Sequence, residues 1–127
     1  MEWLLLVGRV VFGAYFANSG VNHFRRLGMM APYTASMGVP QARLAVVVTG
    51  LMLLLGGLSL ALGYAVWLGS TLLAAFLVPT AVIMHRYWAV PDPMMRANQQ
   101  AHFLKNLALA AANLMLIYFG GGPFSLG

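Results

Sequence analysis

The chain has 127 residues, of which 61% are hydrophobic and only 7% charged, and its mean hydropathy is +0.83. A soluble domain carries about 25% charged residues, so this composition excludes a water-soluble globular fold and indicates a protein embedded in a lipid bilayer. The net charge of +5 does not indicate nucleic-acid binding, because the seven Lys and Arg residues form no basic patch, and the absence of cysteine excludes disulfides and cysteine-ligated clusters.

The first predicted span covers residues 3–20. Ala14 and Ala17 give a weak signal-peptidase pattern, which makes a cleaved signal peptide the competing interpretation. Glu2, however, stands where a signal peptide is basic, and Arg9 interrupts the apolar run. We therefore expect a first span that is retained in the mature protein.

A short amphipathic helix is predicted in the loop that follows, between Arg25 and Gln41. Its apolar residues recur every three to four positions, at Met29 or Met30, Tyr33 and Met37. Pro32 is expected to start this helix, and Gly38 with Pro40 to end it. Such a helix is typical of a segment that lies in the membrane interface.

Two further spans are predicted at residues 42–62 and 65–84, because the uncharged run from Leu44 to Met84 is about twice the length that one crossing needs. Only Gly63 and Tyr64 separate them, which predicts a tight antiparallel hairpin. Pro79 removes a backbone hydrogen bond and is expected to kink the third span, which either opens a cavity or only shapes the packing.

The fourth span is predicted at residues 103–119, in a helix that begins earlier, with Asp92 as its N-cap and Pro93 in its first turn. The predicted fold class is an all-α membrane protein, a single transmembrane domain with four helices in a bundle and a short interfacial helix in the first loop. Gly57 with Ala61, and Ala108 with Ala112, have the small-residue spacing that is typical of helix contacts.

The distribution of arginines predicts the orientation. Five arginines lie on the side of loops one and three, and none on the opposite side: Arg25, Arg26, Arg43, Arg86 and Arg96. By the positive-inside rule, loops one and three are cytoplasmic and both termini face outward. The alternative is that some of these arginines serve a site, which would weaken them as indicators of topology.

Polar residues are predicted to gather at the arginine-rich end of the bundle. One helical stripe of the first span contains Arg9, Gly13, Phe16, Gly20 and His23. A stripe of the third span contains Thr71, Ala74, Val78, Ala81, His85 and Trp88. A stripe of the last helix contains Asn98, His102, Lys105 or Asn106, and Asn113. The candidate residues for binding a ligand or a partner are therefore His23, His85, Trp88, His102, Lys105 and Asn106. The alternative is that they are ordinary interfacial anchors.

Arg9 and Asn113 are the predicted polar residues within the membrane. Arg9 lies about 9 Å from the start of its span and needs acceptors, for which Ser70, Thr71, Asn113 and Glu2 are candidates. The alternative is that its side chain extends outward to the surface. The three histidines lack a short ligand spacing such as H-x3-H, so no metal site is predicted.

Several segments, in order, resemble the DoxX family of small bacterial four-span membrane proteins: Arg9, Ser19-Gly20-x-x-His23-Phe24, Gly38-Val39-Pro40, Thr49-Gly50, Gly56-Gly57, His85-x-x-Trp88, Asp92-Pro93, Phe103-x-Lys105-Asn106 and Gly120-x-Gly122-Pro123-x-Ser125-Leu126. The resemblance implies an inner-membrane helical bundle associated with redox work, since the family name comes from a thiosulfate:quinone oxidoreductase. Members often carry a glutamate where this chain has Leu53, so a pairing of that glutamate with Arg9 does not transfer.

Three functions compete at this point. The first is an accessory membrane subunit of a redox system that holds a quinone or docks an oxidoreductase subunit at the histidine-rich face, with Trp88 stacking on the quinone ring. The second is a small-molecule or ion carrier, and the third a structural or assembly subunit without chemistry; a homo-oligomer is compatible with each. No Ser-His-Asp arrangement is present, so catalysis by this chain alone is not expected, and any catalytic part would be within a quinone-linked oxidoreductase.

Overall fold

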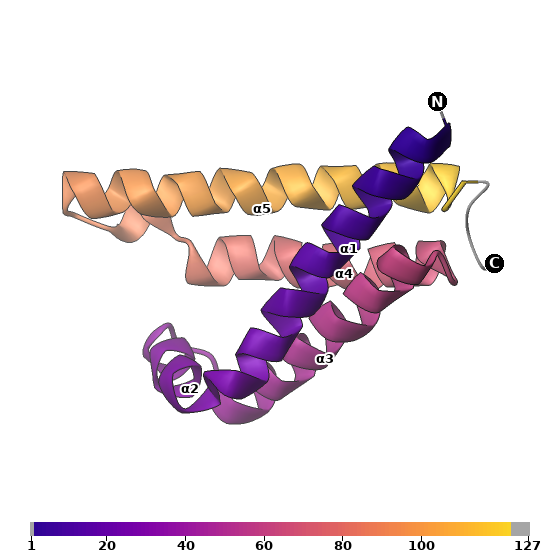
Figure 1. The fold of residues 1–127 in the computed structure, drawn as a ribbon. Coiled ribbons are helices and arrows are strands. Elements are labelled where there is room, and N and C mark those ends of the chain that lie inside the picture. The colour runs from indigo at the N-terminus through magenta and orange to yellow at the C-terminus, as the bar shows by residue number, and fades with distance from the viewer. Residues whose placement is uncertain (1, 123–127) are drawn as a thin grey trace.

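The computed structural model describes residues 2–122, and these residues form long helices joined by short connections (Figure 1). The elements in chain order are α1 (Glu2–Arg25), α2 (Leu27–Ser36), α3 (Ala42–Leu62), α4 (Val66–Met84), the 3-10 helix η1 (Tyr87–Ala89) and α5 (Pro93–Phe119). Four segments are long and apolar enough to cross a membrane: Trp3–Arg25, Ala42–Leu62, Val66–Ala89 and Pro93–Phe119. The predicted fold class is confirmed, with a first span that reaches Arg25 rather than residue 20.

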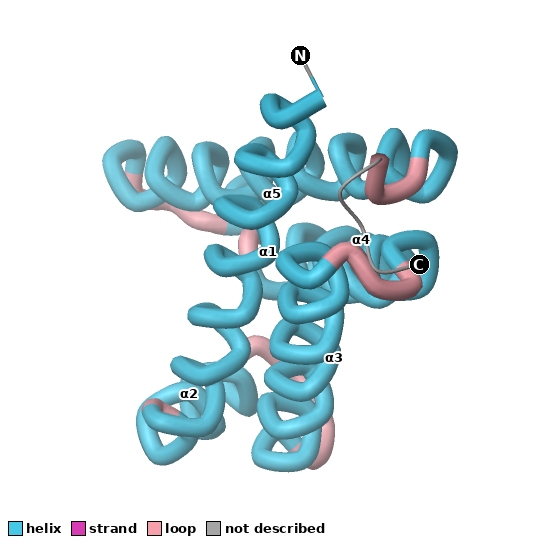
Figure 2. Tube along the Cα trace, turned by 45° about the vertical axis from the view of Figure 1, so that its right-hand side comes forward, coloured by secondary structure: helices cyan, strands magenta, loops and turns pink. Residues whose placement is uncertain are grey.

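The four long helices form two antiparallel pairs. α1 packs along α3, α4 packs along α5, and the two pairs cross obliquely (Figures 1 and 2). The short α3–α4 connection joins the pairs at the end where α1 begins and α5 ends. As a result α2, the end of α4 and the start of α5 all lie toward the opposite end, which is the arrangement that the sequence predicts.

Glycines bring the α1 and α3 backbones together. A Cβ placed on Gly13 would lie 2.5 Å from the carbonyl oxygen of Gly57 and 2.6 Å from the amide nitrogen of Ala61. One further contact of this kind joins Gly20 to the Gly50 carbonyl, at 2.7 Å. Close backbone approach through small residues is the usual source of helix association in lipid, where no hydrophobic drive acts between spans. The predicted role of Gly57 and Ala61 is confirmed.

The turn between α3 and α4 depends on the left-handed conformation of Gly63, whose φ is +71°. The Gly63 and Tyr64 amides donate to the carbonyl of Ser59, at 2.9 and 3.0 Å. The Ser59 hydroxyl then donates to the Tyr64 carbonyl, at 2.5 Å. The last carbonyls of α3 are satisfied locally, which explains how the three residues 63–65, one more than predicted, suffice for the hairpin.

The start of α5 also follows the prediction. The Asp92 carboxylate accepts a hydrogen bond from the Met95 amide at 3.0 Å, and Pro93 occupies the first turn. The buried residues of α5 are Asn106, Ala110 and Asn113. Ala108 is exposed, so the predicted contact through Ala108 and Ala112 is wrong.

The predicted polar stripe of α4 is wrong as well, since Thr71 and Val78 are exposed. The helix instead buries the face formed by Val66, Gly69, Ser70, Leu73, Leu77 and Ala81. The Thr71 hydroxyl donates to the Trp67 carbonyl within the same helix, at 2.7 Å. A threonine satisfied in this way has no need of a buried position.

The predicted interfacial helix is present as α2, packed against α3 and α1. It begins at Leu27, so Pro32 lies inside it and does not start it. Arg86, just after α4, donates through Nη2 to the carbonyl of Met37 at the C-terminal end of α2, at 2.9 Å. A cation at a helix C-terminus is favourable, and this contact ties α2 to the end of α4.

Candidate functional site

A cavity of about 470 Å³ lies between α1, α2, α3, α4 and α5, at the end of the molecule where α2 packs. Its volume is in the usual range for small-molecule sites, about 300–1,000 Å³. Apolar side chains make up most of the wall, including Phe16, Leu53 and Phe76. The polar residues that line it are Tyr15, Ser19, His23, Tyr33, Thr34, Thr49, Thr80, His85, Lys105 and Asn106.

Four of the predicted binding residues therefore line one cavity: His23, His85, Lys105 and Asn106. They come from α1, α5 and the residue that follows α4. Ala75, Pro79 and Thr80 of α4 line the same cavity. Pro79 has no N–H group, so α4 lacks one backbone hydrogen bond at this point. The sequence prediction that three spans deliver polar residues to a shared site is consistent with this placement.

His23 is held by hydrogen bonds to α3. Its Nδ1 lies 3.1 Å from the carbonyl oxygen of Val46 and 3.2 Å from the Thr49 hydroxyl oxygen. The Thr49 hydroxyl donates to the Ala45 carbonyl at 2.7 Å. Since a carbonyl only accepts, Nδ1 carries the proton, and Nε2 is the acceptor nitrogen of the neutral ring. The ring also packs edge-on against Phe76, with centroids 5.9 Å apart.

His85 is positioned by α5. Its Nδ1 donates to Oε1 of Gln99 at 2.8 Å, which leaves Nε2 as the acceptor in the neutral ring. Its ring stacks on His102, with centroids 5.1 Å apart and planes inclined by 22°. His102 itself does not line the cavity. The structure thus places His102 behind His85, where it contacts the ring rather than the cavity space.

Lys105 joins α5 to α1 at the edge of the cavity. Its Nζ lies 3.5 Å from the Tyr15 hydroxyl oxygen. Asn106, the next residue, is 6% exposed and faces the cavity from α5. The chain has only two acidic residues, Glu2 and Asp92, so no carboxylate of this chain lies in the middle of a span to neutralise Lys105.

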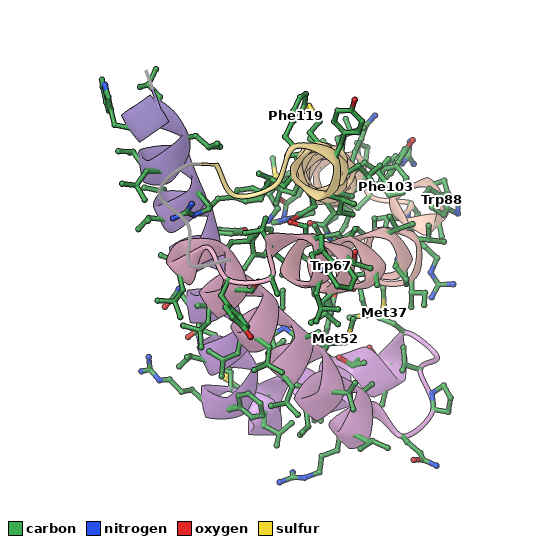
Figure 3. The ribbon with its side chains drawn as sticks, turned by 90° about the vertical axis from the view of Figure 1, so that its right-hand side faces the viewer. Met37, Met52, Trp67, Trp88, Phe103 and Phe119 are labelled. Atoms are coloured by element: carbon green, nitrogen blue, oxygen red, sulfur yellow. The ribbon has the colours of Figure 1, made fainter. Side chains whose placement is uncertain are left out.

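Trp88 does not line the cavity, and its predicted role of stacking on a ring held there is not supported by its position. Its side chain is 55% exposed and packs edge-on against Tyr87 and Phe103, with centroids 5.2 and 5.5 Å apart. Figure 3 shows Trp88 at the periphery near Phe103, away from Met52, which lines the cavity. Trp88 belongs instead to an aromatic cluster on η1 and α5, of which it is the exposed member.

Arg9 and Asn113 lie apart from the cavity, toward the other end of the bundle. Arg9 is 3% exposed and donates through Nη1 to the carbonyl of Gly121, at 2.6 Å. The alternative that Arg9 extends outward into water is therefore wrong. Asn113 is fully buried and donates to the Leu109 carbonyl at 2.9 Å, while Ser70 Oγ and Asn113 Oδ1 lack hydrogen-bond partners among residues 2–122.

A metal site is not supported by the geometry of the described segment. No group of three His, Asp or Glu side chains there is close enough together to hold a metal ion.

The comparisons with known proteins identify the family. Residues 4–86, more than half of the chain, match the sequence profile of the DoxX family. The chain belongs to the DoxX family. Inner membrane protein YphA of Escherichia coli K12 is 29% identical over 123 residues, which cover 97% of this chain and 87% of YphA. No solved structure matches the chain significantly. With its four spans, this DoxX protein is a multi-pass protein of the inner membrane.

Leu53, where the family resemblance implies a glutamate in many members, is 1% exposed and lines the cavity. The register of α1 on α3 sets Gly13 against Gly57 and Ala61. Arg9, one turn before Gly13, therefore lies near the end of α3, about two turns from Leu53. A side chain at position 53 faces the cavity rather than Arg9.

Sequence reasoning missed several residues of this DoxX cavity. Tyr15, Ser19, Tyr33, Thr49 and Thr80 contribute hydroxyl groups to its wall. Tyr15, Thr49 and Thr80 are each a single polar residue within an apolar segment, so no local pattern distinguishes them from a hydroxyl that bonds its own helix. Ser19 and Thr49 had one usable signal, because each stands next to a glycine in a segment that resembles the family.

Proposed function

We propose that this DoxX protein is an accessory membrane subunit of a redox system and that it holds a quinone in the cavity between its helices. The observation that carries the proposal is the composition of the cavity wall. Apolar and aromatic side chains surround a space of about 470 Å³ in which His23, His85, Lys105 and Asn106 all take part. The association of the family with a thiosulfate:quinone oxidoreductase supports the same reading.

The chemistry of a quinone fits this wall. The flat, apolar ring would pack against aromatic faces such as Phe16 and Phe76. Its two carbonyl oxygens accept hydrogen bonds, and the Lys105 ammonium and the Asn106 amide are donors. A cavity with a mostly apolar wall and a few polar groups is the usual design of a small-molecule site.

The histidines suit the reduced form of the same ligand. Reduction of a quinone adds two electrons and two protons, and gives two hydroxyl groups that donate hydrogen bonds. His23 and His85 each hold a proton on Nδ1 toward the protein, so that Nε2 is the acceptor in the neutral ring. The two rings could thus accept from a quinol, or carry protons to a quinone.

The electrons would come from a partner, because a cysteine-free chain offers no thiol redox chemistry of its own. The cluster of Tyr87, Trp88 and Phe103, in which Trp88 is exposed and the other two rings are half-buried, is the candidate docking surface for an oxidoreductase subunit, since it adjoins the His85–His102 stack. In quinone reduction by native membranes, Trp88→Ala is expected to lower the rate without changing quinone binding.

The test is quinone binding by the purified protein in lipid nanodiscs, measured as quinone retained above that of empty nanodiscs. His85→Ala removes a cavity residue, and Gln100→Ala is its control, because Gln100 is polar and exposed on α5 but does not line the cavity. We expect wild type and Gln100→Ala to retain the quinone and His85→Ala to lose about tenfold in affinity, or about 1.4 kcal/mol.

Equal retention by wild-type and empty nanodiscs would refute the proposal. Uptake of a small solute by proteoliposomes, without quinone retention, would favour the carrier hypothesis instead.

A further inference from the structure

A second hollow lies on the outer side of the bundle, between α1 and α5. It has a volume of about 410 Å³ and is lined by Gly8, Val11, Phe12, Tyr15, Lys105 and Leu109. We call it the α1–α5 groove. Tyr15 and Lys105 are its polar residues, and the α1 residues from Gly8 to Phe12 extend from them toward the N-terminal end of α1. The groove therefore has a polar end and an apolar end.

The polar end of the groove coincides with the edge of the cavity. Tyr15, Lys105 and Leu109 line both spaces. The Lys105 Nζ and the Tyr15 hydroxyl, 3.5 Å apart, mark the junction. Both side chains are exposed, so neither is locked in a packed core. A molecule whose head lies in the cavity can leave it at this junction and continue along the groove.

Gly8 differs from the other glycines of the long helices in facing open space, on the side of the groove. A Cβ on Gly8 would meet no atom within 4 Å, whereas each of the other six glycines in the long helices is in close contact with another helix or its side chains. These six are Gly13, Gly20, Gly50, Gly56, Gly57 and Gly69. Glycine inside a helix is unfavourable by up to about 1 kcal/mol relative to alanine. Helix contacts explain the other six but not Gly8.

We propose that the α1–α5 groove holds the isoprenoid tail of the ligand whose ring occupies the cavity. This inference rests on the proposed function and specifies it: the ligand is a long-tailed quinone that enters from the bilayer between α1 and α5. From Tyr15 to Gly8 the groove follows α1 for about 10 Å, at 1.5 Å per residue. Tyr15 and Lys105 then contact the ligand where its ring and tail join.

The groove acts as a path rather than as a source of affinity. Lipid tails are as apolar as the groove wall, so moving the quinone tail from lipid into the groove gains little hydrophobic energy. A blocked groove, however, would close the exit at the junction of Tyr15 and Lys105, so that the tail would have to displace other side chains or lipid to leave the cavity. Blocking the groove should therefore weaken binding of tailed quinones only.

The experiment compares two probes in nanodiscs, one benzoquinone ring without a tail and the same ring with a farnesyl tail. Val11→Trp and Gly8→Leu fill the groove. Val10→Trp is the matched control, because Val10 is also exposed on α1 but does not line the groove. For the two groove variants we expect about tenfold weaker binding of the farnesyl quinone, or about 1.4 kcal/mol, and unchanged binding of the tailless ring.

The possible outcomes separate this inference from the proposed function. If wild type binds neither probe, the proposed function fails. If wild type binds both probes and the groove variants bind the farnesyl quinone as well as Val10→Trp does, the inference about the groove fails while the cavity site stands. If the groove variants instead release a copurifying phospholipid and keep the farnesyl quinone, the groove is a lipid site and the inference is overturned.

Discussion

The glycine contacts between α1 and α3 allow a prediction with an internal control. Gly13 and Gly8 lie in the same helix, five residues apart, and Gly→Ala adds one methyl group at either site. At Gly13 the new Cβ would lie 2.5 Å from the Gly57 carbonyl oxygen, whereas at Gly8 it would meet nothing within 4 Å. The two substitutions therefore share the change in helix propensity and differ in packing.

The magnitude follows from the size of the overlap. Ordinary contacts of a Cβ begin at 3.4 Å, so Gly13→Ala requires a local separation of α1 and α3 by about 0.9 Å. Inserting a methyl group into a tightly packed contact typically costs about 1–3 kcal/mol. Gly8→Ala should be neutral or stabilising by up to about 1 kcal/mol, because alanine favours the helix and nothing is displaced.

The measurement is the free energy of unfolding in mixed micelles of increasing denaturing-detergent fraction, followed by circular dichroism at a helix wavelength. We expect Gly13→Ala to be destabilised and Gly8→Ala to unfold at the same or a higher detergent fraction than wild type. If the two variants have equal stability, α1 and α3 do not pack through backbone contact at Gly13, and the arrangement of the first helix pair described above is wrong.

Three further predictions concern polar contacts. Ser70→Ala should leave the stability unchanged or raise it by about 1 kcal/mol in the same assay, because the buried hydroxyl lacks a partner among residues 2–122. Arg86→Met should speed amide hydrogen exchange in α2, since it removes the hydrogen bond to the Met37 carbonyl. Arg96→Met is the control and should leave exchange in α2 unchanged, because Arg96 donates to the carbonyls of Val90 and Pro91. Asp92→Ala should destabilise the first turn of α5 by about 1 kcal/mol, seen as faster exchange there than in wild type.

The sequence predicts the four spans because hydropathy and length decide which segments cross a bilayer. It also groups on one helical stripe four residues of α1, Arg9, Gly13, Phe16 and Gly20, all of which are buried. The glycines allow close backbone approach, and a charge is costly to expose to lipid, so both favour a face turned to another helix.

The same reasoning fails on α4, where polarity does not mark the buried face. Thr71 faces outward because its hydroxyl bonds a carbonyl of its own helix, while the fully buried Ser70 lacks a partner within the described part of the chain. Short hydroxyl side chains are therefore poor markers of the inner face of a span. The amides of Asn106 and Asn113, which one intrahelical bond cannot satisfy, are both buried.

The cavity lies beyond what sequence pattern predicts, because it depends on how one helix pair crosses the other. His23 and Lys105 line the same space only because α1 and α5 diverge from a common end (Figure 1). Residue spacing predicts which end of each helix carries a group, but not the angle between helices. The placement of Trp88 outside the cavity illustrates the same limit.

Arg9 and Lys105, the two cations in the interior of the long helices, are held in different ways. Arg9 is buried and bonded to the Gly121 carbonyl, so the protein itself supplies an acceptor for that charge. Lys105 is exposed at the edge of a cavity, with one phenol at 3.5 Å and no carboxylate of this chain in the middle of a span. A cation within a membrane span is costly unless something binds it, and a structural role would favour a closed contact like that of Arg9. The open position of Lys105 therefore supports the proposed function, in which a ligand brings its own acceptors, such as the carbonyl oxygens of a quinone.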